Sequence, residues 1–150
     1  MLTIELGRRL GLYRALYGSD LDPKALDAAR ENLRAAGVRA VLAKGDARSH
    51  RPPMPPTLVL TNPPLGRRML RQEGVAELYA ATLAHVAELL VDGGRLVWIS
   101  ALPELTLSHA LREGFTSELR QRVDMGGFQA EIQHFLRVRS PRLGSTRRTA

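Results

Sequence analysis

Three short apolar segments, each followed by a polar residue, constrain the fold of this chain more than any other feature of its sequence. Residues 14–19, 38–44 and 57–61 have the length of β-strands, and helical stripes occur between such segments along the chain. Strands that alternate with helices predict an α/β fold with a mainly parallel sheet. The carboxyl ends of parallel strands meet at one edge, so the polar residues behind these segments are expected to lie together there.

A helix is predicted directly after the first segment. Asp22 is a natural N-cap, Pro23 stands at the first helical position, and Gly37 closes the apolar stripe. Because Asp22 caps the helix, Asp20 is left without a structural role at the end of its strand. Its two oxygens could accept both hydroxyls of a ribose, and the alternative is a solvated turn aspartate.

The second segment also ends in an acid, within Gly45-Asp46-Ala47. Asp46 could accept from the exocyclic amine of a purine, while the Ala47 N–H donates to the neighbouring ring nitrogen. A Gly-Asp pair alone is a weak signal for such a site. The proline-rich residues 51–56 that follow predict a stiff polyproline connector within the domain, with an SH3-type ligand as the alternative.

The third segment leads into a turn made by Asn62, Pro63, Pro64 and Leu65. Asn62 supplies a carboxamide oxygen, and the two prolines fix φ and remove two N–H donors. The backbone carbonyls of this turn are expected to point outward as unpaired acceptors. Such a site suits a planar amine, although Asn and Pro also occur in simple turns that end a strand.

Three arginines follow the turn closely: Arg67, Arg68 and Arg71. Guanidinium groups bind phosphates in a bidentate manner, so this cluster suits the backbone beside a bound nucleotide, with a solvated loop as the alternative. The chain carries 22 basic residues and a formal net charge of +7. This charge predicts attraction to nucleic acid, although codon bias also produces arginine-rich sequences.

The other elements follow from apolar periodicity and turn residues. They are a helix over 1–12, a helix over 75–91, a strand at 95–100 covered on both faces with Trp98 in the core, a helix over 103–112, and an antiparallel pair at 116–124 and 130–138. We expect one domain over residues 1–138 and a disordered basic tail over 139–150.

Several classes of protein and site are excluded by composition. The chain has no cysteine, which excludes disulfides, thiolate zinc sites and any covalent cysteine nucleophile. No apolar run has the length of a membrane helix, and no signal segment is present, so we expect a cytoplasmic protein without a membrane partner. The four histidines lack ligand spacing, and none is assigned to a metal or to catalysis.

Taken together, these motifs resemble the class I S-adenosylmethionine-dependent methyltransferases, and more narrowly the THUMP-associated RNA methylases. The resemblance covers about residues 1–138. It implies a Rossmann-like methyltransferase sheet, with Asp20 on the cofactor ribose, Asp46 and Ala47 on the adenine, and residues 62–65 on the base to be methylated. The segments that carry it are 17–23, 45–47, 62–64, 92–94 and 126–131.

The implied reaction is methylation of an exocyclic base amine in RNA, either rRNA or tRNA, with guanine N2 preferred over adenine N6. Hydrogen bonds from the amine to the Asn62 oxygen and the Pro63 carbonyl would favour a pyramidal nitrogen whose lone pair faces the sulfonium methyl. Base extrusion is implied as well. Two alternatives remain, a non-catalytic RNA-binding remnant and a DNA adenine N6-methyltransferase.

Two departures from the family pattern modify these expectations. Leu65 stands where the family usually has an aromatic residue, so a stacking contribution of about 1–3 kcal/mol per base is lost. No glycine-rich cofactor loop is present, because the sequence begins inside what resembles the helix after that loop. We therefore expect an N-terminally truncated domain whose missing first strand leaves two sheet fragments with open inner edges, and which binds S-adenosylmethionine poorly.

Overall fold

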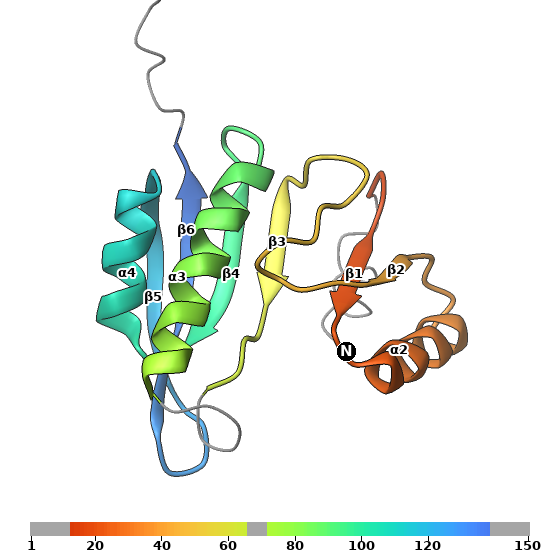
Figure 1. Ribbon diagram of the computed structural model, residues 1–150, viewed down its shortest axis with the longest axis horizontal. Helices are drawn as coiled ribbons and strands as arrows, with labels where there is room; N and C mark the ends of the chain where they lie inside the picture. Colours follow the sequence, from red (N-terminus) through yellow and green to blue (C-terminus); the bar gives the residue numbers. More distant parts are fainter. Residues whose placement is uncertain (1–12, 66–71, 139–150) are drawn as a thin grey trace, which may run out of the picture.

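The computed structural model describes residues 13–65 and 72–138, whose strands form two separate sheets (Figure 1). The smaller sheet has the order β1-β2 and the larger one the order β3-β4-β6-β5. The elements in chain order are β1 (Tyr17–Asp20), α2 (Pro23–Ala35), β2 (Val41–Lys44), β3 (Leu58–Thr61), α3 (Gln72–Leu89), β4 (Arg95–Ser100), α4 (Pro103–Arg112), β5 (Phe115–Asp124) and β6 (Gln129–Arg137).

The smaller sheet is a parallel pair packed on α2. The predicted N-cap is confirmed, since the Asp22 carboxylate accepts a hydrogen bond from the Lys24 N–H at 2.9 Å. The chain leaves α2 at Gly37, whose φ of +66° lies in the left-handed region that favours glycine. Leu26 and Leu33 are the buried residues of α2.

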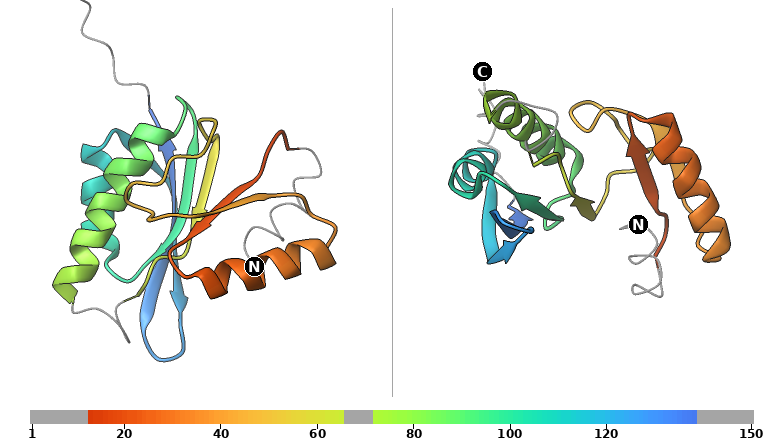
Figure 2. Two further views of the ribbon diagram at one scale, coloured as in Figure 1. Left: turned by 45° about the vertical axis from the view of Figure 1, so that its right-hand side comes forward. Right: turned by 90° about the horizontal axis from the view of Figure 1, so that it is seen from below.

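The larger sheet combines the predicted parallel and antiparallel pairings. β3 and β4 are parallel, while β6 is antiparallel to both β4 and β5. Helices α3 and α4 cover one face of this sheet (Figures 1 and 2). The buried core lies between these helices and the sheet, and its members are Val75, Tyr79, Leu83, Val86, Ala87, Leu90, Leu96, Trp98, Ala110, Phe115 and Phe135.

Strand β4 confirms the predicted core position of Trp98 but corrects its predicted two-sided burial. Leu96, Trp98 and Ser100 are buried, whereas Val97 and Ile99 are only half-buried on the opposite face. The reason is that both covering helices of the described chain lie on one side of the sheet (Figure 2). Only the alternate residues of β4 therefore enter the core.

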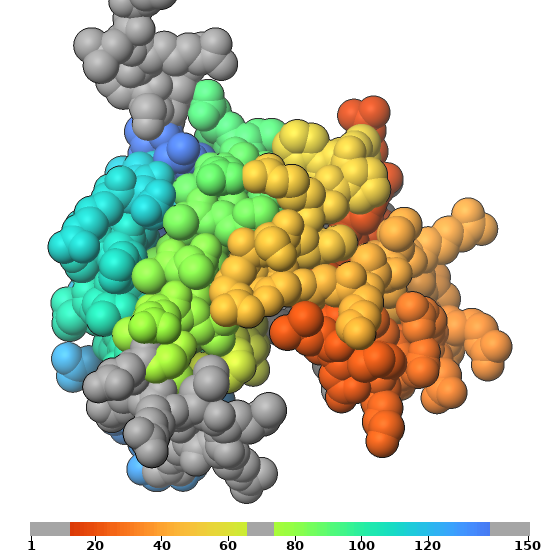
Figure 3. Space-filling view, viewed as in Figure 1, coloured from red at the N-terminus to blue at the C-terminus, as the bar shows by residue number. Residues whose placement is uncertain are grey.

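Each sheet has an edge that is unpaired within the described residues. β1 pairs with β2 alone, and β3 pairs with β4 alone. The expectation of two sheet fragments is thus confirmed. A connector formed by residues 45–57 joins them and lies against α3 (Figure 3). It is held there by hydrogen bonds from the Val91 N–H to the Pro56 carbonyl at 3.2 Å and between His85 Nε2 and the His50 carbonyl at 2.9 Å.

The element boundaries differ from the predicted ones by up to three residues, and α3 begins at Gln72 and ends at Leu89 where a helix over 75–91 was predicted. β1 and β2 begin at Tyr17 and Val41, three residues later than predicted, because pairing is limited to four residue pairs that end at Asp20 and Lys44. The predicted helix over 1–12 and the tail over 139–150 lie outside the described residues. In the described part of the chain, no helix combines the length and apolar character needed to cross a membrane.

Candidate functional site

The carboxyl end of the smaller sheet brings Asp20 and Asp46 together. The Gly45 N–H donates to the Asp20 carbonyl at 3.1 Å, which fixes the start of the Asp46 turn beside the end of β1. Asn62 follows β3 in the other sheet, and the arrows of β1 and β3 point to the same end of the molecule (Figure 1). The predicted common edge is therefore shared by two sheets rather than formed by one.

Asp20 is exposed, and it has a structural role that was not predicted from the sequence. Its Oδ1 accepts the Asp22 N–H at 2.8 Å, which closes a local turn just before α2. Both acids of this segment thus stabilise the entry to the helix. Among the described residues only Oδ1 of Asp20 accepts a hydrogen bond, so Oδ2 remains open to a ligand hydroxyl.

Asp46 is paired with Arg48, a partner that sequence reasoning missed. Both carboxylate oxygens accept from the Arg48 side chain at 2.5–3.1 Å, and Oδ1 also accepts the Arg48 N–H at 2.9 Å. The hydrogen bond from the Arg48 side chain is the main reason that the pKa of Asp46 is lowered to about 2. The spacing of an arginine two residues after an aspartate in a turn was the available signal. Ala47 is exposed beside this pair.

The Asn-Pro-Pro turn presents its polar side chain to solvent. Asn62 and Pro64 are exposed, Pro63 is buried, and Leu65 is half-buried. The expectation that the turn carbonyls are unpaired is wrong for Pro64, because its carbonyl accepts the Tyr79 hydroxyl at 3.1 Å. The predicted phosphate-binding residues Arg67, Arg68 and Arg71 lie outside the described residues.

A buried polar network lies behind this turn, at the carboxyl end of β4. Gln133 Oε1 accepts from Trp98 Nε1 at 2.9 Å and from Thr106 Oγ1 at 2.6 Å. Its Nε2 donates to the Pro103 carbonyl and to Glu131 Oε1, both at 2.9 Å. Sequence reasoning assigned Trp98 to the core without finding these partners, since Gln133 lies 35 residues away and shows no local motif.

An ion-pair cluster extends the network toward the surface. Arg120 donates to both oxygens of Glu131, at 2.6 and 3.2 Å, and also to Glu104. Burial alone would raise the pKa of Glu131, but the hydrogen bonds from Arg120 and Gln133 outweigh burial, so its pKa lies below the usual value. Pairing with the two glutamates raises the pKa of Arg120. The cluster therefore stays ionised at neutral pH.

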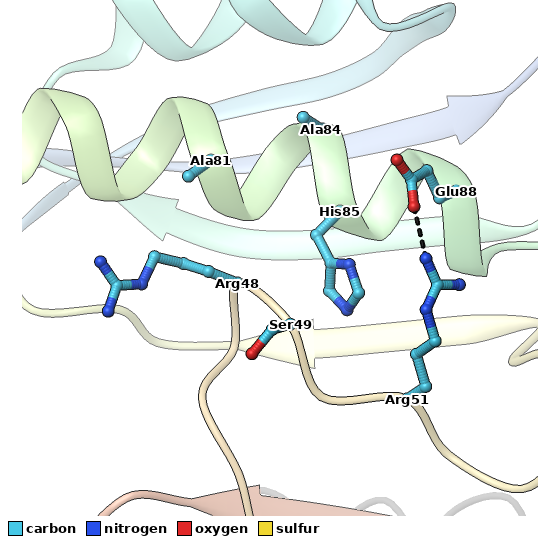
Figure 4. Close-up of a pocket in the computed structure, with 7 residues that line it drawn as sticks. All are labelled: Arg48, Ser49, Arg51, Ala81, Ala84, His85 and Glu88. Atoms are coloured by element: carbon cyan, nitrogen blue, oxygen red, sulfur yellow. Dashed lines mark hydrogen bonds and ion pairs between the residues drawn. The ribbon is translucent and has the colours of Figure 1, made fainter.

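A pocket of about 360 Å³ lies between the connector and α3 (Figure 4). Arg51 of the connector pairs with Glu88 at 2.5 Å at one end, and His85 stands in the middle of the wall. Arg48, which pairs with Asp46, belongs to this wall as well. The remaining lining residues are Ser49, Ala81 and Ala84. In the described residues, no group of three or more His, Asp or Glu side chains could hold a metal ion.

Comparisons with known proteins identify relatives of this chain. The chain is 36% identical over 134 residues to the tRNA (guanine(6)-N2)-methyltransferase of Thermus thermophilus, and the match covers 87% of this chain and 39% of that enzyme. The chain thus spans about two fifths of the length of this relative. The crystal structure of TrmN from Thermus thermophilus superimposes with a TM-score of 0.78 and 31% identity, covering 90% of this chain and 40% of that one.

A more distant structure shows the same fold. Magnesium protoporphyrin IX methyltransferase from Synechocystis, solved with bound SAM, matches with a TM-score of 0.71 at 16% identity, covering 91% of this chain and 64% of that one. The Rossmann-like methyltransferase fold expected from the sequence is confirmed by these structures. The family model described as "RMKL-like, methyltransferase domain" matches residues 3–130. The chain therefore belongs to the RMKL-like methyltransferase domain family.

Proposed function

We propose that this chain supplies the base-binding and adenosine-binding parts of an RNA N-methyltransferase, with the exocyclic N2 of guanine as the preferred acceptor over adenine N6. The observation that carries the proposal is the exposed Asn62 carboxamide at the end of β3, anchored by a buried Pro63. Family membership supports methyl transfer, and the similar Thermus enzyme, named for guanine N2 in tRNA, supports the acceptor.

The turn would hold and activate the acceptor amine. The lone pair of an exocyclic amine is delocalised into the ring, which makes the nitrogen a poor nucleophile. Hydrogen bonds to Asn62 Oδ1 and the Pro63 carbonyl would hold the amine and favour a pyramidal nitrogen. Leu65 would press on the base face in place of an aromatic ring. Positioning, rather than a strong base, is then the main contribution of these residues.

The end of the smaller sheet fits the adenosine part of S-adenosylmethionine, which supplies an electrophilic sulfonium methyl group when bound. Oδ2 of Asp20 is open to a ribose hydroxyl, and Asp46 follows the end of β2, the strand that pairs with β1. Asp46 would accept the adenine amine and the Ala47 N–H would donate to the ring. The Arg48 side chain is 52% exposed and that of Asp46 is 25% exposed, so Arg48 can move into solvent when the amine takes its place on the carboxylate.

We expect weak affinity for the cofactor. Both proposed cofactor contacts lie on a two-stranded sheet, which is a marginal structure in water unless other elements support it. The net charge of +7 supports RNA as the partner, with Arg67, Arg68 and Arg71 as proposed phosphate contacts. The separation of the two sheets specifically favours a second candidate, a non-catalytic RNA-binding remnant.

Methyl transfer from labelled S-adenosylmethionine to tRNA and rRNA tests the proposal, with nucleoside mass spectrometry to separate N2-methylguanosine from N6-methyladenosine. Asn62→Ala is expected to reduce transfer at least about 100-fold and to leave cofactor affinity unchanged. The matched control is Asn32→Ala, which makes the same change at an exposed position of α2 and should retain activity.

Three results would contradict the proposal or select another function. Equal transfer by wild type and Asn62→Ala would remove the turn from the reaction. Salt-dependent RNA binding that survives Asn62→Ala, without transfer and without a cofactor effect, would establish the remnant. Methylation of a matched DNA oligonucleotide at adenine would establish a DNA enzyme.

A further inference from the structure

Tyr79 of α3 joins the Asn-Pro-Pro turn to the junction between β4 and α4. Its side chain is fully buried, and its ring centroid lies 5.2 Å from that of Trp98. The hydroxyl donates to the Pro64 carbonyl at 3.1 Å and accepts from the Ala101 N–H at 3.5 Å. Desolvation by burial raises the pKa of Tyr79, so the hydroxyl keeps the proton that it donates. One side chain thus connects the end of β3 to the end of β4.

Within the two prolines of the turn, one backbone dihedral angle is left for this hydrogen bond to restrain. The proline rings fix φ of Pro63 and Pro64. Asn62 and Pro63 each precede a proline, which confines their ψ angles to the extended region. Pro64 precedes Leu65, so its ψ has no such restraint from sequence. The hydrogen bond from Tyr79 to the Pro64 carbonyl restrains this angle, which also sets the direction in which the chain reaches Leu65.

We propose that Tyr79 is a positioning residue that sets Leu65 against the face of the target base by fixing the Pro64 carbonyl. The inference rests on the proposed function, since Leu65 contacts a base only if the turn holds one. It adds a residue from α3 to the site, although Tyr79 itself does not touch the base. In this proposal, Tyr79 acts on Leu65 through its hydrogen bond to the Pro64 carbonyl.

The junction between β4 and α4, which Tyr79 contacts through the Ala101 N–H, is rigid, as a positioning role requires. Ser100 Oγ accepts the Leu102 N–H at 3.0 Å, and the Leu102 carbonyl accepts the Thr106 N–H at 3.0 Å. Gln133 Nε2 donates to the Pro103 carbonyl at 2.9 Å. The segment that contains the Ala101 N–H is therefore held on both sides. The Tyr79 hydroxyl, which accepts from this N–H, is thus anchored to a rigid part of the fold.

Tyr79→Phe tests the proposal, because it keeps the ring in the core and removes only the hydroxyl. Thr82→Val is a matched control on the same helix. Thr82 is 3% exposed, and its Oγ1 has no hydrogen-bond partner within the described residues, so the control deletes a buried hydroxyl that holds nothing. The first readout is the ¹H–¹⁵N signal of the Leu65 amide in the full chain. The second is kcat for methyl transfer to RNA, measured separately from KM for S-adenosylmethionine.

Tyr79→Phe is expected to move the Leu65 signal and increase its fast backbone motion. It should also lower kcat about tenfold with KM for the cofactor unchanged, while Thr82→Val changes neither readout. An unchanged Leu65 signal overturns the proposal, as does an unchanged kcat in an active protein. If the wild type transfers no methyl group, the proposed function fails. The Leu65 signal then still decides whether Tyr79 fixes the turn.

Discussion

Replacement of Gln133 by methionine should destabilise the larger sheet by about 2–4 kcal/mol. Gln133 is fully buried and uses both ends of its carboxamide, whereas methionine has a similar volume and no strong donor or acceptor. Thr106 Oγ1 can still donate to the Pro103 carbonyl at 3.0 Å, and Glu131 keeps Arg120. Trp98 Nε1 is then the buried donor left without a partner, at a cost of about 1–3 kcal/mol, and the lost net hydrogen bonds supply the remainder.

Urea unfolding followed by tryptophan fluorescence measures this cost directly. Trp98 is the single tryptophan of the chain and lies in β4, so its emission reports on the larger sheet. Gln121→Met makes the same change at an exposed position of β5 and should alter the free energy of unfolding by less than about 0.5 kcal/mol. A cost for Gln133→Met no larger than that of the control, with unchanged emission, would refute the reasoning.

Three further changes should give distinct results. Arg48→Gln should raise the pKa of Asp46 from about 2 toward 3.8, as measured by carboxyl NMR titration. In the wild type, the lowered pKa of Asp46 stabilises the fold at neutral pH. This stabilisation is lost as the pH falls below about 4 and through about 2. Gly45→Ala should cost about 1–3 kcal/mol in urea unfolding, because the new Cβ would lie 2.6 Å from His50 Cγ. Arg137→Met should cost about 1.5–3 kcal/mol in the same assay, because its guanidinium donates to three backbone carbonyls at 2.7–3.0 Å.

The fold was largely predictable because its signals are local. The Asp22 cap and Pro23 mark the start of α2 through contacts that span only a few residues. The alternating apolar residues of the last two strands likewise predict their antiparallel pairing, which the structure confirms. Burial on one face of β4 was not predictable, since a continuous apolar run fits a strand covered on one side as well as on both.

The candidate site was predictable only where the chain forms turns. Asn62 and Asp46 stand out because a polar residue follows an apolar run. Tyr79 and Gln133 do not stand out, because each looks like an ordinary member of its helix or strand. Their partners lie 15 and 35 residues away, at Pro64 and Trp98, so only the folded chain reveals the hydrogen bonds. The hydrogen bond that Asp20 accepts from the Asp22 N–H was missed, because sequence reasoning assigned the structural role in this short turn to Asp22 alone.

The division into two sheets has a consequence for how ligands would bind. In the proposed assignment, Asp20 and Asp46 hold the methyl donor on one sheet while Asn62 holds the acceptor on the other. The separation between donor and acceptor then depends on the relative orientation of the sheets. A ligand that contacts both sheets restricts this orientation and lowers the entropic cost of binding the second ligand. Cofactor and RNA should therefore raise each other's affinity by the same factor, whichever binds first.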